Sequence, residues 1–131
     1  MAAFDMLRIA GSSLAVHQTW LDALANNIAN VNTIKPTSQS AFQAQMINAT
    51  ALPQGGVAVG GIALSSAQGR LEYAPENPLA DAGGYVRAPD VDMASQMSQL
   101  IMAQRGFQAS VQVTKNAQDT YSSALEIGRR A

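Results

Sequence analysis

The stretch LRIAGSSLAVHQTWLDALANNIANV, Leu7 to Val31, decides the fold that we predict for this chain. Its apolar residues and its single histidine recur in alternating steps of three and four residues. A heptad pattern of this length predicts a long helix that packs by coiled-coil rules. We expect this helix to run from Asp5 to Asn32 within an N-terminal segment, residues 1–36, that Pro36 closes. The seam positions are Leu7, Ala10, Leu14, His17, Leu21, Leu24, Ile28 and Val31.

A second heptad pattern occupies residues 90–131. Asp90 and Asp92 suit the start of a helix, because a carboxylate there accepts hydrogen bonds from free backbone N–H groups. The expected seam consists of Met93, Met97, Leu100, Gln104, Phe107, Val111, Thr114, Gln118, Tyr121 and Leu125. Neither helix can bury its stripe alone, so we expect the two to pack against each other or against neighbouring chains.

Between the two helices, residues 37–89 lack the heptad pattern. Glycine residues separate the short segments VAV, IAL, RLEY and YVRA, which is typical of strands. Residues 37–51 fit either one or two helical turns or an extended loop. The predicted fold class is therefore mainly α, with long N- and C-terminal helices packing in coiled-coil fashion and a small β-rich insert between them.

Composition limits the classes of function. Among 131 residues only 13% are charged, the net charge is −1, and there is no cysteine. Disulfides and thiolate metal sites are excluded, and no basic surface suggests a nucleic-acid partner. No apolar run approaches the roughly 20 residues that span a bilayer, and we expect no cleaved signal peptide. A surface so poor in charge favours association with other proteins.

We expect no catalytic residue, no metal site and no cofactor, and hence no enzyme. His17 is the only histidine, and a polar residue in a heptad seam more often sets the register of two helices than performs catalysis. The glycine-rich segment GGVAVGG, residues 55–61, lacks the Lys-Ser or Lys-Thr that completes a phosphate loop. A turn in a small sheet is the simpler interpretation.

Asparagine is frequent near the end of the first helix, although it is a poor helix former. Asn26, Asn27 and Asn30 fall outside the seam, and no charged residue lies between Asp22 and Lys35. A merely solvated helix face normally carries Glu, Lys and Arg, whereas an uncharged amide face suits packing against other helices. We therefore expect these asparagines on the flanks and outer face of the helix, where they contact other subunits.

Three segments resemble those of bacterial flagellar rod and hook proteins. LDALANNIANVNT (21–33) is similar to the N-terminal signature of that family, and YAPENPLADAGGYVRAPDVD (73–92) to the linker before its C-terminal helix. MSQLIMAQRGFQASVQVTKNAQDTYSSALEI (97–127) resembles the C-terminal helix itself. Within the family, the short insert and the Pro, Asp and Gly-Tyr-Val positions of residues 75–89 most resemble the FlgC type of proximal rod proteins.

The resemblance implies a structural subunit of the flagellar basal-body rod, in the periplasmic space. Such a subunit is exported by the flagellar type III apparatus without a cleaved signal peptide. It polymerises with copies of itself and other rod proteins into the shaft that transmits torque. Another proximal rod subunit, or a coiled-coil adaptor that forms a closed complex, remains an alternative.

The residues expected at the subunit interface come from both helices and combine seam positions with the three asparagines. They are Leu14, His17, Leu21, Leu24, Asn26, Asn27, Ile28, Asn30, Val31, Met97, Leu100, Gln104, Phe107, Val111, Tyr121 and Leu125.

Overall fold

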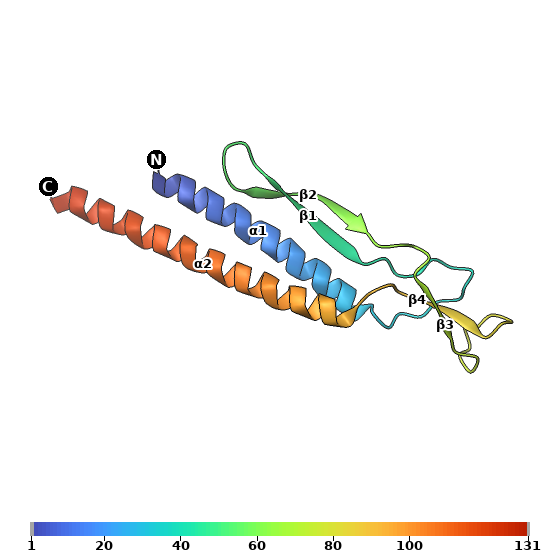
Figure 1. Cartoon of the computed structure of the whole chain (residues 1–131). Coiled ribbons are helices and arrows are strands. Elements are labelled where there is room, and N and C mark those ends of the chain that lie inside the picture. The colour runs from blue at the N-terminus through green and yellow to red at the C-terminus, as the bar shows by residue number, and fades with distance from the viewer. Residues whose placement is uncertain (1, 131) are drawn as a thin grey trace.

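The computed structural model describes residues 2–130 and contains two long helices and two small two-stranded sheets (Figure 1). Helix α1 spans Ala2–Ala29 and helix α2 spans Met93–Arg130. The strands between them are β1 (Gln45–Ala51), β2 (Val57–Leu64), β3 (Arg70–Tyr73) and β4 (Tyr85–Ala88). The predicted fold class is confirmed. Met1 and Ala131, which the expected terminal segments include, lie outside the described residues.

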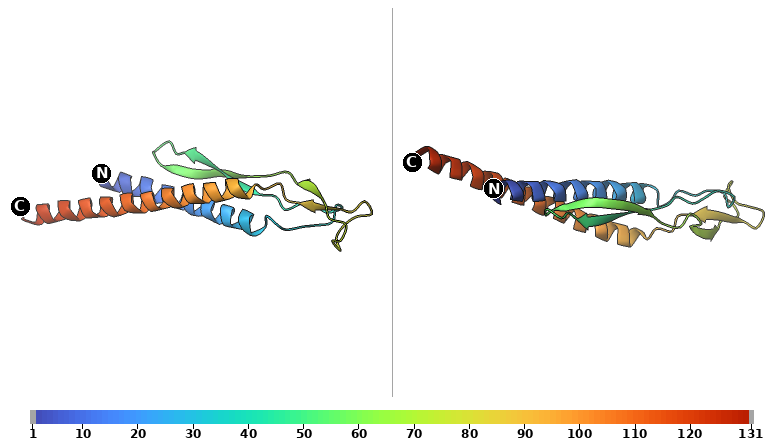
Figure 2. Two further views of the ribbon diagram at one scale, coloured as in Figure 1. Left: turned by 60° about the horizontal axis from the view of Figure 1, so that its bottom comes forward. Right: turned by 90° about the horizontal axis from the view of Figure 1, so that it is seen from above.

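The two helices are antiparallel, and α1 lies between α2 and the β1–β2 hairpin (Figure 1). Helix α1 contacts both neighbours, whereas within residues 2–130 α2 and the hairpin make no direct element-to-element contact. Strands β3 and β4 lie at the end of the elongated molecule opposite to the chain termini (Figure 2). No helix in the described part of the chain is sufficiently long and apolar to cross a membrane.

Polar side chains set the inner ends of both helices. Helix α1 ends at Ala29, before the expected Asn32, and the Asn30 amide donates to the Asn26 carbonyl at 2.9 Å. The same carbonyl also accepts from the Asn30 N–H at 3.2 Å, so both the main chain and the side chain of Asn30 hold the last turn of the helix. Helix α2 begins at Met93, where the Asp92 carboxylate accepts from the Ser95 N–H at 3.1 Å. The expected capping by an aspartate is thus confirmed.

The insert contains one strand that the sequence pattern did not identify. Residues 37–44 are non-helical, and β1 follows and pairs antiparallel with β2. The register shifts by one residue at Asn48/Ala49, opposite Gly60, which is a β-bulge. A Cβ at Gly60 would overlap the Thr50 side chain, so a larger residue there would require Thr50 to move. The other expected strand segments, VAV, IAL, RLEY and YVRA, all lie in strands.

Asn27 joins α1, β1 and α2, and its position corrects the expectation that it faces outward. Its side chain is only 1% exposed. Its amide group donates to the Gln45 carbonyl and to the Gln96 side chain, both at 2.9 Å, and its oxygen accepts from the Gln45 N–H at 2.8 Å. Asn27 thus lies where β1 and Gln96 of α2 both cover α1, and it does not face outward.

The β3–β4 end of the molecule is held by main-chain and side-chain hydrogen bonds rather than by a large apolar core. Lys35 and Arg87 form a two-bond antiparallel bridge at 2.9 and 2.8 Å. The Arg87 guanidinium also donates to the carbonyls of Thr37 and Gln68. Together these bonds tie the segment after α1 and the segment before β3 to β4.

The loop between β3 and β4 closes around Asp81. Its carboxylate accepts from the N–H of Tyr85 at 3.0 Å, the hydroxyl of Thr37 at 3.0 Å and the N–H of Gly83 at 2.9 Å. These hydrogen bonds, with that from Tyr85 the strongest cause, hold the pKa of Asp81 below its ordinary value of 3.8. Gly84 adopts a φ of 80°, which the turn requires and which glycine adopts without strain.

Replacing Asn27 by alanine should destabilise the chain by about 2–4 kcal/mol, because the part-buried N–H and C=O of Gln45 and the Gln96 side chain lose their partner. The matched control is Asn26→Ala, one residue earlier on the exposed face, which should leave stability unchanged or raise it by about 0.5 kcal/mol. Urea unfolding followed by circular dichroism measures both. Equal effects of the two substitutions would contradict the role of Asn27.

The Asp81 carboxyl should titrate below 3.8 when its chemical shift is followed by NMR. Because folding lowers this pKa, the carboxylate stabilises the loop above pH 3.8, and this contribution disappears as the pH falls through the folded-state pKa. The protection of the Gly83 and Tyr85 amides from exchange, relative to the intrinsic rate at each pH, should therefore fall in that window. In Asp81→Asn, which cannot ionise, this pH dependence should be absent; its persistence would assign it to another group.

Candidate subunit interface

The contact between α1 and α2 is made largely by small side chains. On α2, the positions that face α1 recur every seven residues at Gln96, Ala103, Ser110 and Ala117. Ala103 is 0% exposed and Ala117 is 1% exposed. Among the helices and strands of residues 2–130, α2 contacts α1 alone, so α1 buries these residues. Small residues let the two helix backbones approach closely along this line of the contact.

This contact corrects the seam expected for α2. Leu100, Phe107 and Thr114 are half-buried as expected, but Met97 and Val111, two other expected positions, are exposed. The heptad spacing was right, and the face assignment was shifted by about one residue. The sequence does carry a signal for the true contact, since Ala103, Ser110 and Ala117 recur at intervals of seven, but small residues are a weaker indicator of a helix contact than large apolar ones.

A short polar network fixes the register of the two helices. The His17 Nδ1–H donates to the Ser13 carbonyl at 2.8 Å, and the Ser110 hydroxyl donates to the Gly106 carbonyl at 2.9 Å. The Ser13 hydroxyl is then the donor to the Ser110 oxygen, at 2.9 Å. The imidazole of His17 lies directly on Gly106, where any Cβ would overlap it. His17 therefore occupies the helix–helix contact, as its seam position predicted.

Helix α2 is longer than α1 and extends past its N-terminal end (Figure 1). Because Ser13 pairs with Ser110, the first residues of α1 lie level with Tyr121. The rings of Phe4 and Tyr121 meet there edge to face, with centroids 5.2 Å apart. The residues of α2 after Tyr121 thus have no part of α1 beside them, and Leu125 and Ile127 are exposed in this overhang.

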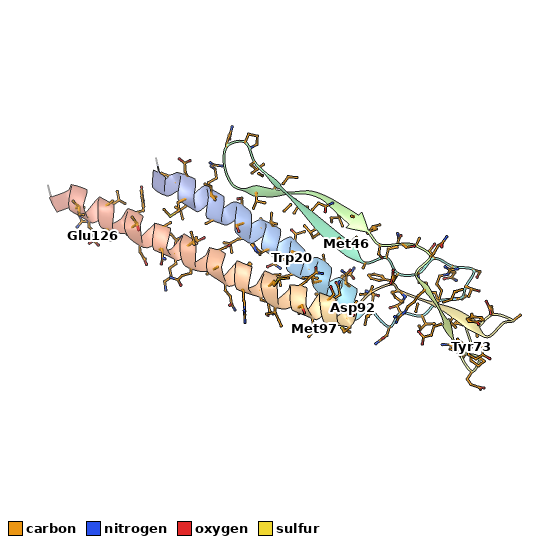
Figure 3. All side chains as sticks on the ribbon, in the orientation of Figure 1. Trp20, Met46, Tyr73, Asp92, Met97 and Glu126 are labelled. Atoms are coloured by element: carbon orange, nitrogen blue, oxygen red, sulfur yellow. The ribbon has the colours of Figure 1, made fainter. Side chains whose placement is uncertain are left out.

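Large apolar side chains lie on the outer side of α2. Met93, Met97 and Ile101 follow each other at four-residue intervals, and Met97 and Ile101 are 46% and 50% exposed. Figure 3 shows Met97 on the outer side of α2. Residues four apart form one ridge on a helix surface, and such ridges pack into the grooves of neighbouring helices. The single chain leaves this ridge without a partner.

The structure divides the sixteen residues expected at the subunit interface into three groups. Leu24, Asn27 and Val31 are buried within the chain. Half-buried are Leu14, His17, Leu21, Ile28, Asn30, Leu100 and Phe107. Exposed are Asn26, Met97, Gln104, Val111, Tyr121 and Leu125. The exposed group is available for contacts with other chains, and its role in an interface stays a prediction.

The arrangement supports binding through helix surfaces. Among residues 2–130 there is no cluster of three or more histidine, aspartate or glutamate side chains that could hold a metal ion. His17, Ser13 and Ser110 direct their hydrogen bonds to each other and to main-chain carbonyls. The feature left without a partner is the apolar outer surface of the two helices.

Two protein-family models match the chain. The model described as "Flagella basal body rod protein" matches residues 7–34, and "Flagellar basal body rod FlgEFG protein C-terminal" matches residues 82–127. These ranges contain most of α1 and, with β4, most of α2.

Curated relatives align along nearly the whole chain. The flagellar basal-body rod protein FlgC of Salmonella typhimurium is 34% identical over 98% of this chain and 100% of its own length. FlgC of Escherichia coli O6:H1 has the same identity and coverage. FlgC of Bacillus subtilis is 27% identical, again over 98% of this chain and 100% of the relative.

Gly106→Ala should destabilise the chain by about 1–3 kcal/mol, because the added methyl group overlaps the His17 ring in the tight helix contact. Gly11→Ala is the matched control: nothing lies near its Cβ, so it should stabilise α1 by up to about 1 kcal/mol. Adding His17→Ala to Gly106→Ala should recover most of the loss. Thermal unfolding measures the stability of the single and double variants. If the losses of stability are additive, the methyl group at position 106 does not overlap the His17 ring.

Proposed function

Because this chain belongs to the FlgC family of flagellar basal-body rod proteins, we propose that it polymerises through α1 and α2 into the shaft that transmits torque across the periplasm. Family membership makes the chain a structural subunit of the rod, located in the flagellar basal body. How its subunits join is the content of the proposal.

One observation carries it: small residues of α2 occupy the centre of its contact with α1, and several large apolar residues of α2 remain exposed. Ala103, Ser110 and Ala117 face α1, whereas Met97 and Val111 are exposed. A monomer that needed only its own stability would bury the large side chains first, since each is worth about 1.5–3 kcal/mol when buried. An exposed apolar surface along helices of this length indicates that other chains cover it.

The shape of the molecule supports a polymer rather than a closed complex. The two ends differ, with the α2 overhang at one end and the β3–β4 sheet at the other (Figure 1). Contacts between unlike surfaces that do not close into a ring produce a helical filament. In such a shaft, close-packed side chains resist deformation, which is what transmission of torque requires.

The partners in the proposed shaft are copies of this chain and other rod proteins. We propose that the chain reaches this position through the flagellar type III export apparatus without cleavage of a signal peptide. A coiled-coil adaptor would instead bind one partner in a complex of fixed size. The stoichiometry of the isolated assembly distinguishes the two.

The chain should co-purify with detergent-extracted basal bodies when a tag is inserted between Glu76 and Asn77, in the exposed loop after β3. Met97→Glu combined with Val111→Glu should reduce this recovery at least tenfold. Both side chains are exposed in the single chain, so their charges would disturb only contacts with other chains.

The matched control is Gln39→Glu with Ser40→Glu, which adds the same charge to an exposed loop away from the helices. Recovery of this control and loss of the helix variant, at equal cellular level and equal helicity, supports assembly through the helices. Recovery of the unsubstituted chain only as a small soluble complex would favour the adaptor.

A further inference from the structure

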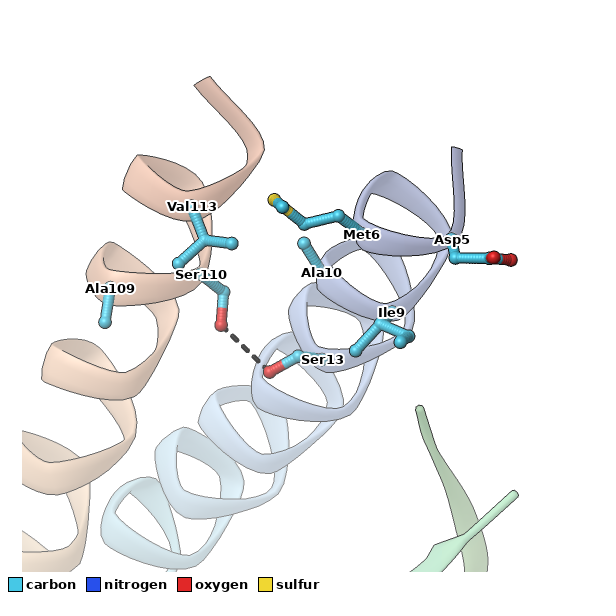
Figure 4. Close-up of a pocket in the computed structure, with 8 residues that line it drawn as sticks. All are labelled: Asp5, Met6, Ile9, Ala10, Ser13, Ala109, Ser110 and Val113. Atoms are coloured by element: carbon cyan, nitrogen blue, oxygen red, sulfur yellow. Dashed lines mark hydrogen bonds between the residues drawn. The ribbon is translucent and has the colours of Figure 1, made fainter. Parts of the chain in front are cut away.

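An apolar groove of about 560 Å³ lies between the N-terminal half of α1 and the middle of α2 (Figure 4). Met6, Ile9 and Ala10 line it from α1, and Ala109 and Val113 line it from α2. Figure 4 shows the hydrogen bond between Ser13 and Ser110 at one end of the groove. No described segment of the chain fills it, although its lining is mostly apolar.

The rim of the groove carries a negative charge. Asp5 belongs to the groove lining on the α1 side, and its carboxylate points away from α2 (Figure 4). Within residues 2–130 the charged group that faces it is Arg8, at 3.6 Å, and both side chains are largely exposed. Such an exposed pair is weak, so the carboxylate can also bind a cation of another chain.

The outer ridge of α2 has the complementary chemistry. Met97 and Ile101 are exposed apolar side chains, and Arg105 is the next residue at the same four-residue interval. Arg105 is exposed and makes no ion pair among the described residues. The ridge therefore presents two apolar side chains followed by a free positive charge, whereas the groove presents an apolar floor beside a carboxylate.

The spacing along the helices fits as well. If Ile101 of one copy lies level with Val113 of another parallel copy, Met97 lies level with Ala109, which leaves room for it. The same shift of twelve residues brings Arg105 level with residue 117. Asp5 lies eight residues before Ser13 in the antiparallel α1, and is therefore level with residue 118. One register thus satisfies both apolar positions and the charge.

We propose that the groove between α1 and α2 receives the ridge Met97, Ile101 and Arg105 of a second copy of this chain, with Arg105 paired to Asp5. The proposal rests on the rod function proposed above and specifies one contact within it. Twelve residues of helix correspond to about 18 Å, so each copy is displaced by that distance along the helix axis relative to the next. Each step of four residues turns about 40° around the helix, so Ala109 and Val113 lie about 120° around α2 from Met97 and Ile101. Groove and ridge are therefore different surfaces, and the contact repeats from copy to copy without closing a dimer.

Cysteine cross-linking tests this contact directly, since the natural chain contains no cysteine. The test variant carries Ile101→Cys and Val113→Cys. Within one chain these positions are about 18 Å apart along α2, well beyond the reach of a disulfide, so any bridge joins two copies. Basal bodies from motile cells are treated with a mild oxidant and separated without reducing agent.

We expect a ladder of dimers, trimers and larger species, at least tenfold more abundant than in the control Ile101→Cys with Gln112→Cys. Gln112 is adjacent to Val113 in sequence but does not line the groove. Each single-cysteine variant should give no ladder. An equal ladder from the control pair, or dimers from one single-cysteine variant, would overturn the proposed register.

Basal bodies that contain the test variant but show no ladder would also overturn the groove contact, and the rod function would stand. Absence of the unsubstituted tagged chain from basal bodies would instead contradict the proposed rod function itself.

If the variant with both cysteines does not enter basal bodies, an exchange of charges between positions 5 and 105 tests the same contact. Arg105→Glu should reduce incorporation into basal bodies at least fivefold, since Asp5 and the new carboxylate repel each other. Adding Asp5→Arg to the same chain should restore at least half of the incorporation, because every contact between copies regains opposite charges. No restoration, with both variants folded, would contradict the pairing of Asp5 with Arg105.

Discussion

The hydrogen bonds of the buried Asn27 amide hold the three main parts of the molecule in one register. This side chain bonds both main-chain groups of Gln45 in β1 and the side chain of Gln96 in α2. Loss of any one of these hydrogen bonds would lower the free energy of unfolding by about 1–3 kcal/mol. The three elements therefore adopt the arrangement that satisfies all of them. The position of the β1–β2 hairpin on α1, and of α2 beside it, follows from that requirement.

Beyond this junction, the contact between the two helices has small side chains at its centre. Small residues of α2 lie against α1, and His17 occupies the space that Gly106 leaves open. The large apolar residues Met97 and Ile101 are consequently excluded from the contact and remain at the surface. In a monomeric protein this would be a defect. In a rod subunit this exposure has a use, because one face of the helix stabilises the subunit and the other faces remain available to contact neighbouring subunits.

Prediction from the sequence was most successful where local patterns are strong. Heptad spacing predicted both long helices, Asp92 was recognised as a helix cap, and glycine-bounded segments marked three of the four strands. It was weaker for β1, whose sequence QMINATA has no regular alternation of apolar and polar residues. It was wrong about Asn27, because an amide at that position faces outward unless a distant segment covers it.

The sequence by itself determined the helices, their approximate ends and the family, since these depend on neighbouring residues and on local motifs that a single chain displays. Only the tertiary structure decided which helix face is internal. Two stripes on α2, one of small residues and one of large apolar residues, both have heptad spacing, and periodicity cannot rank them. His17 on Gly106 and Ser13 with Ser110 bring the backbones close together, so the small-residue stripe faces α1. Leu100 and Phe107 then lie half-buried at the edge of the contact, and Met97 and Val111 lie outside it.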